Sequence, residues 1–391
     1  MTRHAQLSFA IGCFSTLLFI SGHAAGQANI SRAAEVKTYM EQGQRALREN
    51  QTQAAAEAYR SILKIDPGNV EARANLGVVD MVTGDWAQAS EELNRALKLN
   101  PGQRKVQALL GLCEVHLGRR SEAAKLLSAS FAQLDDPKLR HQAGLELLEL
   151  WYQGGDLNKA NVVLGQLQHF YPTDAAVSYA AYRVYSDLAF QAVRSLALNA
   201  PDSALLHTAL AEHMVNEGHA PEAIAEYQKA LATTPNAPSL HYELGEAILA
   251  NSHLEASLAE AQKEFEAALL LNPTDARSEC NLGKIEQWRS NSTTASNHYE
   301  RALKLNPEIV CAQLGLAGLL EEEGKTEQVL GYLKSAARAD PYNAEVHHRL
   351  AVLYRTMGQT QEADHEMSTF QELKSVEDQL QKVLQPELPS N

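Results

Sequence analysis

The sequence predicts an all-α protein built as a stack of helical hairpins. Eight prolines, at positions 67, 101, 137, 172, 235, 273, 307 and 341, recur roughly every 34 residues and close successive helical blocks. A ninth proline, at position 201, ends a shortened block. No Gly- and Pro-rich strand signals separate the blocks. A period of this length is typical of a solenoid, in which each unit packs on its neighbours, rather than of one globular core.

The first segment of the chain has the features of a secretory signal peptide. Arg3 and His4 precede an uncharged apolar stretch from residue 7 to residue 20, and small residues follow at 21–26. We therefore expect a signal peptide over 1–24, cleaved after Ala24, with Ala28 as the alternative, and a short linker over 25–35. The apolar run is too short for a comfortable membrane span, and Cys13 comes too early in it for a lipoprotein cleavage box. This interpretation predicts a periplasmic or secreted protein without stable membrane insertion.

The blocks share small and large residues at fixed offsets. In the block that ends at Pro101, Gly77 lies where two helices must approach closely, and Ala89 lies early in the second helix, where a larger side chain would wedge the hairpin apart. Leu93 follows one turn later as a large residue that fills the gap to the next hairpin. The equivalents of Ala89 are Ala123, Ala160, Ala223, Ala295 and Ala363, and those of Leu93 are Tyr59, Leu127, Leu164, Tyr227, Phe265, Tyr299 and Leu333.

This pattern resembles the tetratricopeptide repeat (TPR) family. The resemblance covers about ten units over 36–370 and implies a right-handed superhelical solenoid of helix-turn-helix units. Two units depart from the pattern: the one between Pro172 and Pro201 is short and lacks a clear inter-helix turn, and the one before Pro273 carries about four extra residues around 252–259. Apolar residues at helical spacing predict a capping helix over 371–385, before a polar tail at 386–391.

Charge and cysteine content restrict the function further. A formal net charge of −14 and an aromatic content of 6% argue against nucleic-acid binding. Cys280 and Cys311 lie in the first helices of neighbouring units. A bond between them is conceivable in an oxidising compartment, but axes of packed helices are roughly 8–10 Å apart and a disulfide needs Cα atoms within about 7 Å, so we expect the pair to stay apart. Cys113 is expected to be a small buried residue.

Catalytic and metal-binding patterns are missing from the sequence. It holds no phosphate-binding glycine loop, no His-Glu-x-x-His, no Cys-x-x-Cys and no nucleophile elbow. His347 and His348 are adjacent, so they point to different sides of a helix and cannot grip one metal together. We therefore predict a protein that is not an enzyme and that has no cofactor and no metal.

Binding is the remaining function, and the resemblance implies that first helices line a concave inner wall. Apolar residues follow the inward stripe in the second and third units. One interpretation is an exposed apolar strip that binds an amphipathic helix or an extended peptide. The alternative is that the curvature of the stack buries these residues, or that the assumed register is wrong by one position. Farther along, Trp288 near Arg277 and Lys284 is either a binding anchor or a residue that fills the gap beside the Ser290–Asn291 turn. The candidate partner-binding residues are Val78, Met81, Val82, Leu112, Val115, His116, Arg277, Lys284 and Trp288.

One specialised binding mode of TPR proteins does not fit. Co-chaperones that capture C-terminal carboxylates resemble one another in a Lys or Arg four residues before an Asn in the first unit, and here Met40 and Gln44 hold those places. We predict a non-catalytic scaffold or adaptor of the cell envelope that binds a peptide or helix of a protein partner in its groove. The alternative is a regulatory or substrate-presenting subunit of an envelope enzyme or of secretion or exopolysaccharide machinery. A monomer or weak dimer is expected.

Overall fold

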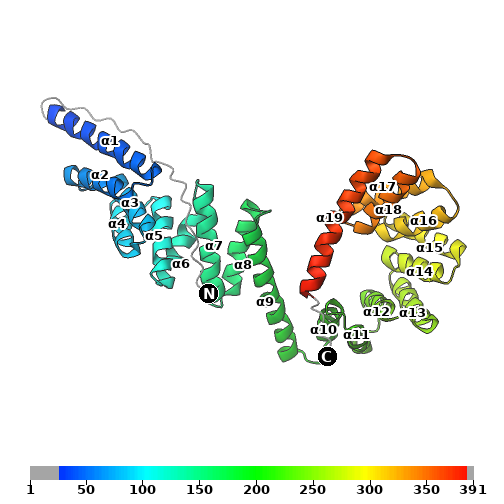
Figure 1. Ribbon diagram of the computed structural model, residues 1–391. Coiled ribbons are helices and arrows are strands. Elements are labelled where there is room, and N and C mark those ends of the chain that lie inside the picture. Colours follow the sequence, from blue (N-terminus) through cyan, green and yellow to red (C-terminus); the bar gives the residue numbers. More distant parts are fainter. Residues whose placement is uncertain (1–25, 385–391) are drawn as a thin grey trace, which may run out of the picture. The chain divides into compact units, whose positions relative to one another are not determined.

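The computed structural model describes residues 26–384, and every regular element in that range is a helix (Figure 1). The predicted all-α class is therefore confirmed. The predicted signal peptide at 1–24 and polar tail at 386–391 lie outside the described residues.

The chain divides into two compact units, and the division falls after Gln191, inside the long helix α9. The helices up to this division are α1 (Gly26–Arg48), α2 (Thr52–Ile65), α3 (Val70–Val82), α4 (Trp86–Leu99), α5 (Arg104–His116), α6 (Arg120–Ser130), the short 3₁₀ helix η1 (Phe131–Gln133), α7 (Pro137–Gln153), α8 (Leu157–Phe170) and α9 (Ala175–Asn199). The second unit continues with α10 (Ala204–Asn216), α11 (Ala220–Thr233), α12 (Pro238–Asn251), α13 (Glu255–Leu271), α14 (Ala276–Trp288), α15 (Ser292–Leu305), α16 (Val310–Glu322), α17 (Thr326–Ala339), α18 (Ala344–Thr356) and α19 (Thr360–Leu384).

Consecutive helices pair into hairpins, and each hairpin packs on the next within its unit (Figure 1). Across residues 26–384 the hairpins are α1–α2, α3–α4, α5–α6, α7–α8, α10–α11, α12–α13, α14–α15, α16–α17 and α18–α19, and α9 has no second helix of its own. The nine hairpins and this single helix match the ten units expected from the proline spacing.

A large side chain on the second helix of a hairpin packs over a glycine on the first helix. A Cβ atom added to Gly77 would lie 2.7 Å from Leu93 Cγ, and one added to Gly283 would lie 2.6 Å from the Tyr299 ring. Ala89 and its five predicted equivalents are fully buried, and Leu93 with its equivalents is at most 1% exposed. The predicted packing register of the repeats is therefore confirmed.

The turn inside most hairpins needs one residue with positive φ. Glycine supplies it six times, and Asn50 (φ 62°) and Ser290 (φ 63°) take the same place in two other hairpins. Glycine adopts this left-handed conformation without steric cost, whereas the Cβ atom of serine makes it unfavourable. The glycines in this position are Gly84, Gly118, Gly155, Gly218, Gly324 and Gly358.

The irregular units differ from the others in identifiable ways. The shortened unit after Pro172 forms the single continuous helix α9, as the missing turn signal suggested. The extra residues before Pro273 lengthen α13, which has 17 residues where α15 and α17 have 14. Pro137 begins α7 instead of ending a block, because proline is favoured at the first helical position. The predicted capping helix is not a separate element, since residue 371 lies inside the continuous helix α19.

Polar pairs tie first and second helices together in the second unit. Each consists of a largely buried histidine and glutamate, with the histidine Nδ1 2.6 or 2.7 Å from a carboxylate oxygen. His347, one of the two adjacent histidines, belongs to this set and also places Nε2 3.0 Å from the Pro341 carbonyl oxygen. The pairs are His207–Glu226, His241–Glu264, His298–Glu279 and His347–Glu366.

Cys280 and Cys311 form a disulfide bond, so the expectation that they stay apart is wrong. Their Cα atoms are 6.3 Å apart, within the range a disulfide requires. The separation of helix axes, about 8–10 Å, overestimates the distance between the two Cα atoms. Each Cα lies about 2.3 Å from its own helix axis, and these two Cα atoms face each other, so they are closer than the axes are. Cys113 is fully buried, and its burial raises the pKa of the thiol to about 12, which confirms its expected role as a packed apolar residue.

Candidate protein-interaction site

The first helices of neighbouring hairpins contact one another and form a wall. In the first unit α3 contacts α5 and α5 contacts α7, and in the second unit α14 contacts α16. Second helices make no comparable contacts with each other among the described residues. Side chains that point inward from successive first helices are thereby brought onto one surface.

In the first unit the predicted apolar strip is largely part of the core. Met81 and Leu112 are each 2% exposed, so the interpretation of these two as a groove surface is wrong. The physical reason is the close contact between α3 and α5, which covers the inward positions of both helices. Val78 and Val115 are half-buried against the same core, and Val82 is 38% exposed.

His116 lies at the edge of this strip and has an aromatic partner. Its ring stacks on Trp86 with the ring centroids 3.7 Å apart. Partial burial lowers the pKa of His116, which favours the uncharged imidazole. His116 and Val82 are therefore the accessible members of the candidate set in the first unit.

In the second unit the three candidates lie on α14 and remain accessible. The Arg277 guanidinium lies 4.0 Å from the centroid of the Tyr242 ring and keeps 54% of its side chain exposed. Trp288 is 46% exposed and contacts His253, with the ring centroids 4.5 Å apart. Lys284 lies between them along the helix and is half-buried. Trp288 thus packs on a neighbouring loop and still presents half of its surface.

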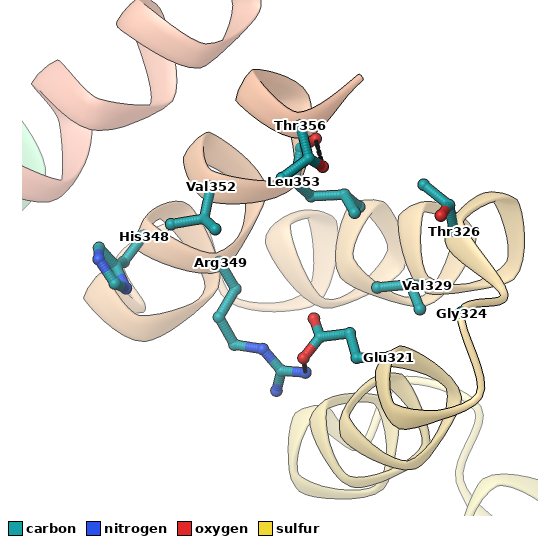
Figure 2. A pocket seen from close by; sticks show the side chains of 9 residues that line it. All are labelled: Glu321, Gly324, Thr326, Val329, His348, Arg349, Val352, Leu353 and Thr356. Carbon is teal, nitrogen blue, oxygen red and sulfur yellow. Dashed lines mark hydrogen bonds and ion pairs between the residues drawn. The ribbon is translucent and has the colours of Figure 1, made fainter. Parts of the chain in front are cut away.

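A pocket of about 350 Å³ opens farther along the second unit, between α16, the start of α17, and α18 (Figure 2). Val329 forms part of its buried floor, and Val352 stands at its side, 47% exposed. The other lining residues are Glu321, Gly324, Thr326, His348, Arg349, Leu353 and Thr356.

The charges in this pocket are already paired. Arg349 points toward Glu321, with Nη2 3.0 Å from Oε2, and its Nη1 donates a hydrogen bond of 3.0 Å to the Leu314 carbonyl oxygen (Figure 2). A neutralised guanidinium has little attraction for a free anion, so the pocket suits an apolar side chain beside a polar rim. His348 lies at that rim, with its ring centroid 4.9 Å from that of Phe370.

Sequence reasoning did not select Val352, although a signal was present. Val352 follows Pro341 by the same offset at which Val78 follows Pro67 and Lys284 follows Pro273. Counting that offset through every unit would have placed it on the inner wall.

Residues 26–384 offer neither a metal site nor a membrane span. This part of the chain holds no group of three His, Cys, Asp or Glu side chains placed to bind a metal ion. No helix within it is long and apolar enough to cross a membrane.

Family models match three stretches of the chain. Residues 46–113 and 280–344 each match a tetratricopeptide repeat model, and residues 215–252 match a TPR repeat model. The chain belongs to the tetratricopeptide repeat family. Each matched stretch consists of consecutive helices of the hairpins described above, and the TPR hairpins between them carry the same packing register.

Individual relatives are distant. The TPR repeat-containing thioredoxin TTL4 of Arabidopsis thaliana is 30% identical over 90 residues, which cover 23% of this TPR chain and 13% of that protein. The structure of MamA from Desulfovibrio magneticus RS-1 aligns at 18% identity over 45% of this chain and 97% of its own, with a TM-score of 0.36. Cut9–Hcn1 of the APC/C aligns at 13% identity over 92% and 98%, with a TM-score of 0.35. The TPR2AB domain of yeast Sti1 aligns at 14% identity over 65% and 96%, with a TM-score of 0.31.

Proposed function

We propose that this TPR protein is an exported, non-catalytic scaffold that binds a peptide or helix of a partner protein on the inner wall of its second unit. The observation that carries the proposal is the accessible row on α14 and α18, where Arg277, Trp288 and Val352 each expose about half of the side chain. Tetratricopeptide repeats support a role in protein interaction, and a stack of hairpins offers a long surface rather than a single cleft.

The chemistry of the row indicates the kind of segment that binds. Trp and Arg are enriched among the residues that dominate protein interfaces. The pocket beside Val352 has room for one apolar side chain of the partner. A second apolar side chain of the partner packs on the exposed half of the Trp288 ring. The partner segment therefore carries apolar anchors at two separated positions, as an amphipathic helix or an extended peptide does.

The disulfide bond supports export. Disulfides persist in oxidising compartments and are rare where thiols are kept reduced. The bond between Cys280 and Cys311 thus agrees with the signal peptide expected over 1–24 and with a role in the cell envelope. N-terminal sequencing of the chain recovered outside the cytoplasm should find a start after Ala24, and recovery of the intact N-terminus would contradict processing.

Partner capture from envelope extract tests the binding surface. The mature chain serves as bait, alone and with the paired changes Trp288→Ala and Val352→Glu. Leu270→Glu is the matched control, because Leu270 is 84% exposed on α13, a second helix. We expect a protein that the wild type and the control retain and the paired variant loses, with equal helicity in all three. A partner retained by all three baits would move the binding surface off the inner wall.

A further inference from the structure

The helix α9 has the composition of a hairpin that lacks its turn. Pro201 follows Pro172 by 29 residues, about five fewer than the repeat period. The deficit falls where the other hairpins have their inter-helix turn, and α9 runs without a break from Ala175 to Asn199. Its two halves therefore cannot fold back on each other.

The first half of α9 keeps the buried face of a first helix and exposes the opposite one. Val177, Ala180 and Val184 are buried in the core of the first unit. Tyr182 is 64% exposed and stands ten residues after Pro172, the offset at which Gly77 follows Pro67 and is covered by a second helix. Tyr185, 47% exposed, lies one turn farther along the same side, and its hydroxyl donates a hydrogen bond of 3.0 Å to Gln168 on α8. At Tyr182, the surface that a second helix covers in other hairpins is thus open.

The second half of α9 has the register of a second helix. Ala189, Val193 and Leu196 precede Pro201 by the offsets at which Ala89, Leu93 and Ala96 precede Pro101. Those three in the regular hairpin are fully buried. In α9, by contrast, Ala189 is exposed and the other two are half-buried.

These residues form one stripe whose spacing reads the same in both directions. The intervals along Tyr182, Tyr185, Ala189, Val193 and Leu196 are three, four, four and three residues, which keeps all five on one face of the helix. If a second α9 is laid antiparallel across this face, Tyr182 meets Leu196 of the second copy and Tyr185 meets Val193. Ala189 meets itself on the two-fold axis, where a small side chain permits close approach. Such self-complementarity is what an isologous interface requires.

We propose that a second copy of this chain covers the stripe, so that two α9 helices pair antiparallel and rebuild the missing hairpin contacts between chains. Loss of a hinge turn is a recognised route to exchange of an element between identical chains. An aromatic side chain buries on the order of 150–250 Å², so the exposed parts of the two tyrosines contribute roughly 400 Å² in total from both copies. That is below the roughly 1,200 Å² of a standard stable interface, so the dimer is weak and depends on concentration.

Cross-linking of the mature chain tests the geometry at the centre of the stripe. Ala189→Cys places two cysteines together on the axis and should yield covalent dimers on mild oxidation. Leu198→Cys is the matched control, since Leu198 is 73% exposed on the far side of α9 and should stay monomeric. Cys113 is buried, and the other two cysteines are already bonded, so they add little background. Cross-linking of both variants alike, or of the control alone, would overturn the proposal.

Sedimentation over a concentration series tests the energetics. The wild type should shift from monomer to dimer as concentration rises, and Tyr182→Glu with Tyr185→Glu should remain monomeric with unchanged helicity. Leu198→Glu should sediment as the wild type does. A Gly-containing insertion of five residues after Asp187 should also give a monomer, because the two halves of α9 then pair within one chain. A wild type that stays monomeric throughout, or a tyrosine variant or insertion variant that still dimerises, would refute the antiparallel pairing.

Discussion

Removal of the Cys280–Cys311 disulfide should destabilise the second unit by an amount that its loop length sets. The bond joins α14 to α16 and closes a loop with a sequence separation of 31 residues. In the chain-entropy model, a loop of this length restricts the unfolded chain by about 3.7 kcal/mol at 25 °C. Replacement of both cysteines by alanine should lower the free energy of unfolding by about 3 to 4 kcal/mol.

Chemical unfolding followed by Trp288 fluorescence measures this loss. Trp288 is the tryptophan of the second unit, and Trp86→Phe with Trp151→Phe leaves it as the reporter. Reductant should lower the free energy of unfolding of the wild-type unit by as much as the double alanine substitution does. It should not change the free energy of unfolding of the double alanine variant. Equal unfolding midpoints with and without reductant would show that the bond adds no stability, and the entropic reasoning would fail.

Three further substitutions test individual packing and electrostatic arguments. Burial raises the pKa of Asp80 to about 6, so the folded state binds the proton more tightly than the unfolded state. The contribution of this group to stability therefore rises as pH falls through 6. Asp80→Asn should raise the free energy of unfolding at pH 7 by up to about 3 kcal/mol, and this gain should fade below pH 4. An equal gain at pH 7 and at pH 4 in thermal unfolding would contradict the argument. Ala89→Trp should cost about 3 kcal/mol by overpacking, and an unchanged melting curve would refute the register. Ser290→Gly should raise the free energy of unfolding by about 1 kcal/mol by removing the positive-φ penalty, and a loss of stability in urea unfolding would contradict this.

Most of the fold could be predicted because the packing contacts repeat. Gly77 and Leu93 meet within one hairpin, so a fixed spacing in the sequence corresponds to a fixed contact in space. The absence of a turn signal between Pro172 and Pro201 likewise predicted an irregular unit, and α9 is that unit. Local signals sufficed wherever the contact itself was local.

The candidate site was less predictable, since exposure depends on how closely neighbouring helices approach. Met81 and Leu112 share the inward direction with Val352, yet the first two are buried and Val352 is half exposed. The spacing between hairpins decides this, and no single repeat encodes it. The same closeness brought Cys280 and Cys311 within bonding distance, against the estimate from average helix separation.

Site-specific photo-cross-linking tests most directly whether the inner wall of the second unit is the working surface. A photoreactive phenylalanine analogue is placed at Val352, and in a second protein at Leu270 on the outer α13, and both are irradiated in envelope extract. The proposed function predicts that the probe at Val352 cross-links one protein through a single segment. Trp288→Ala should reduce the yield of this product, and the probe at Leu270 should not form it. Cross-linking of the same protein at Leu270 and not at Val352 would contradict it.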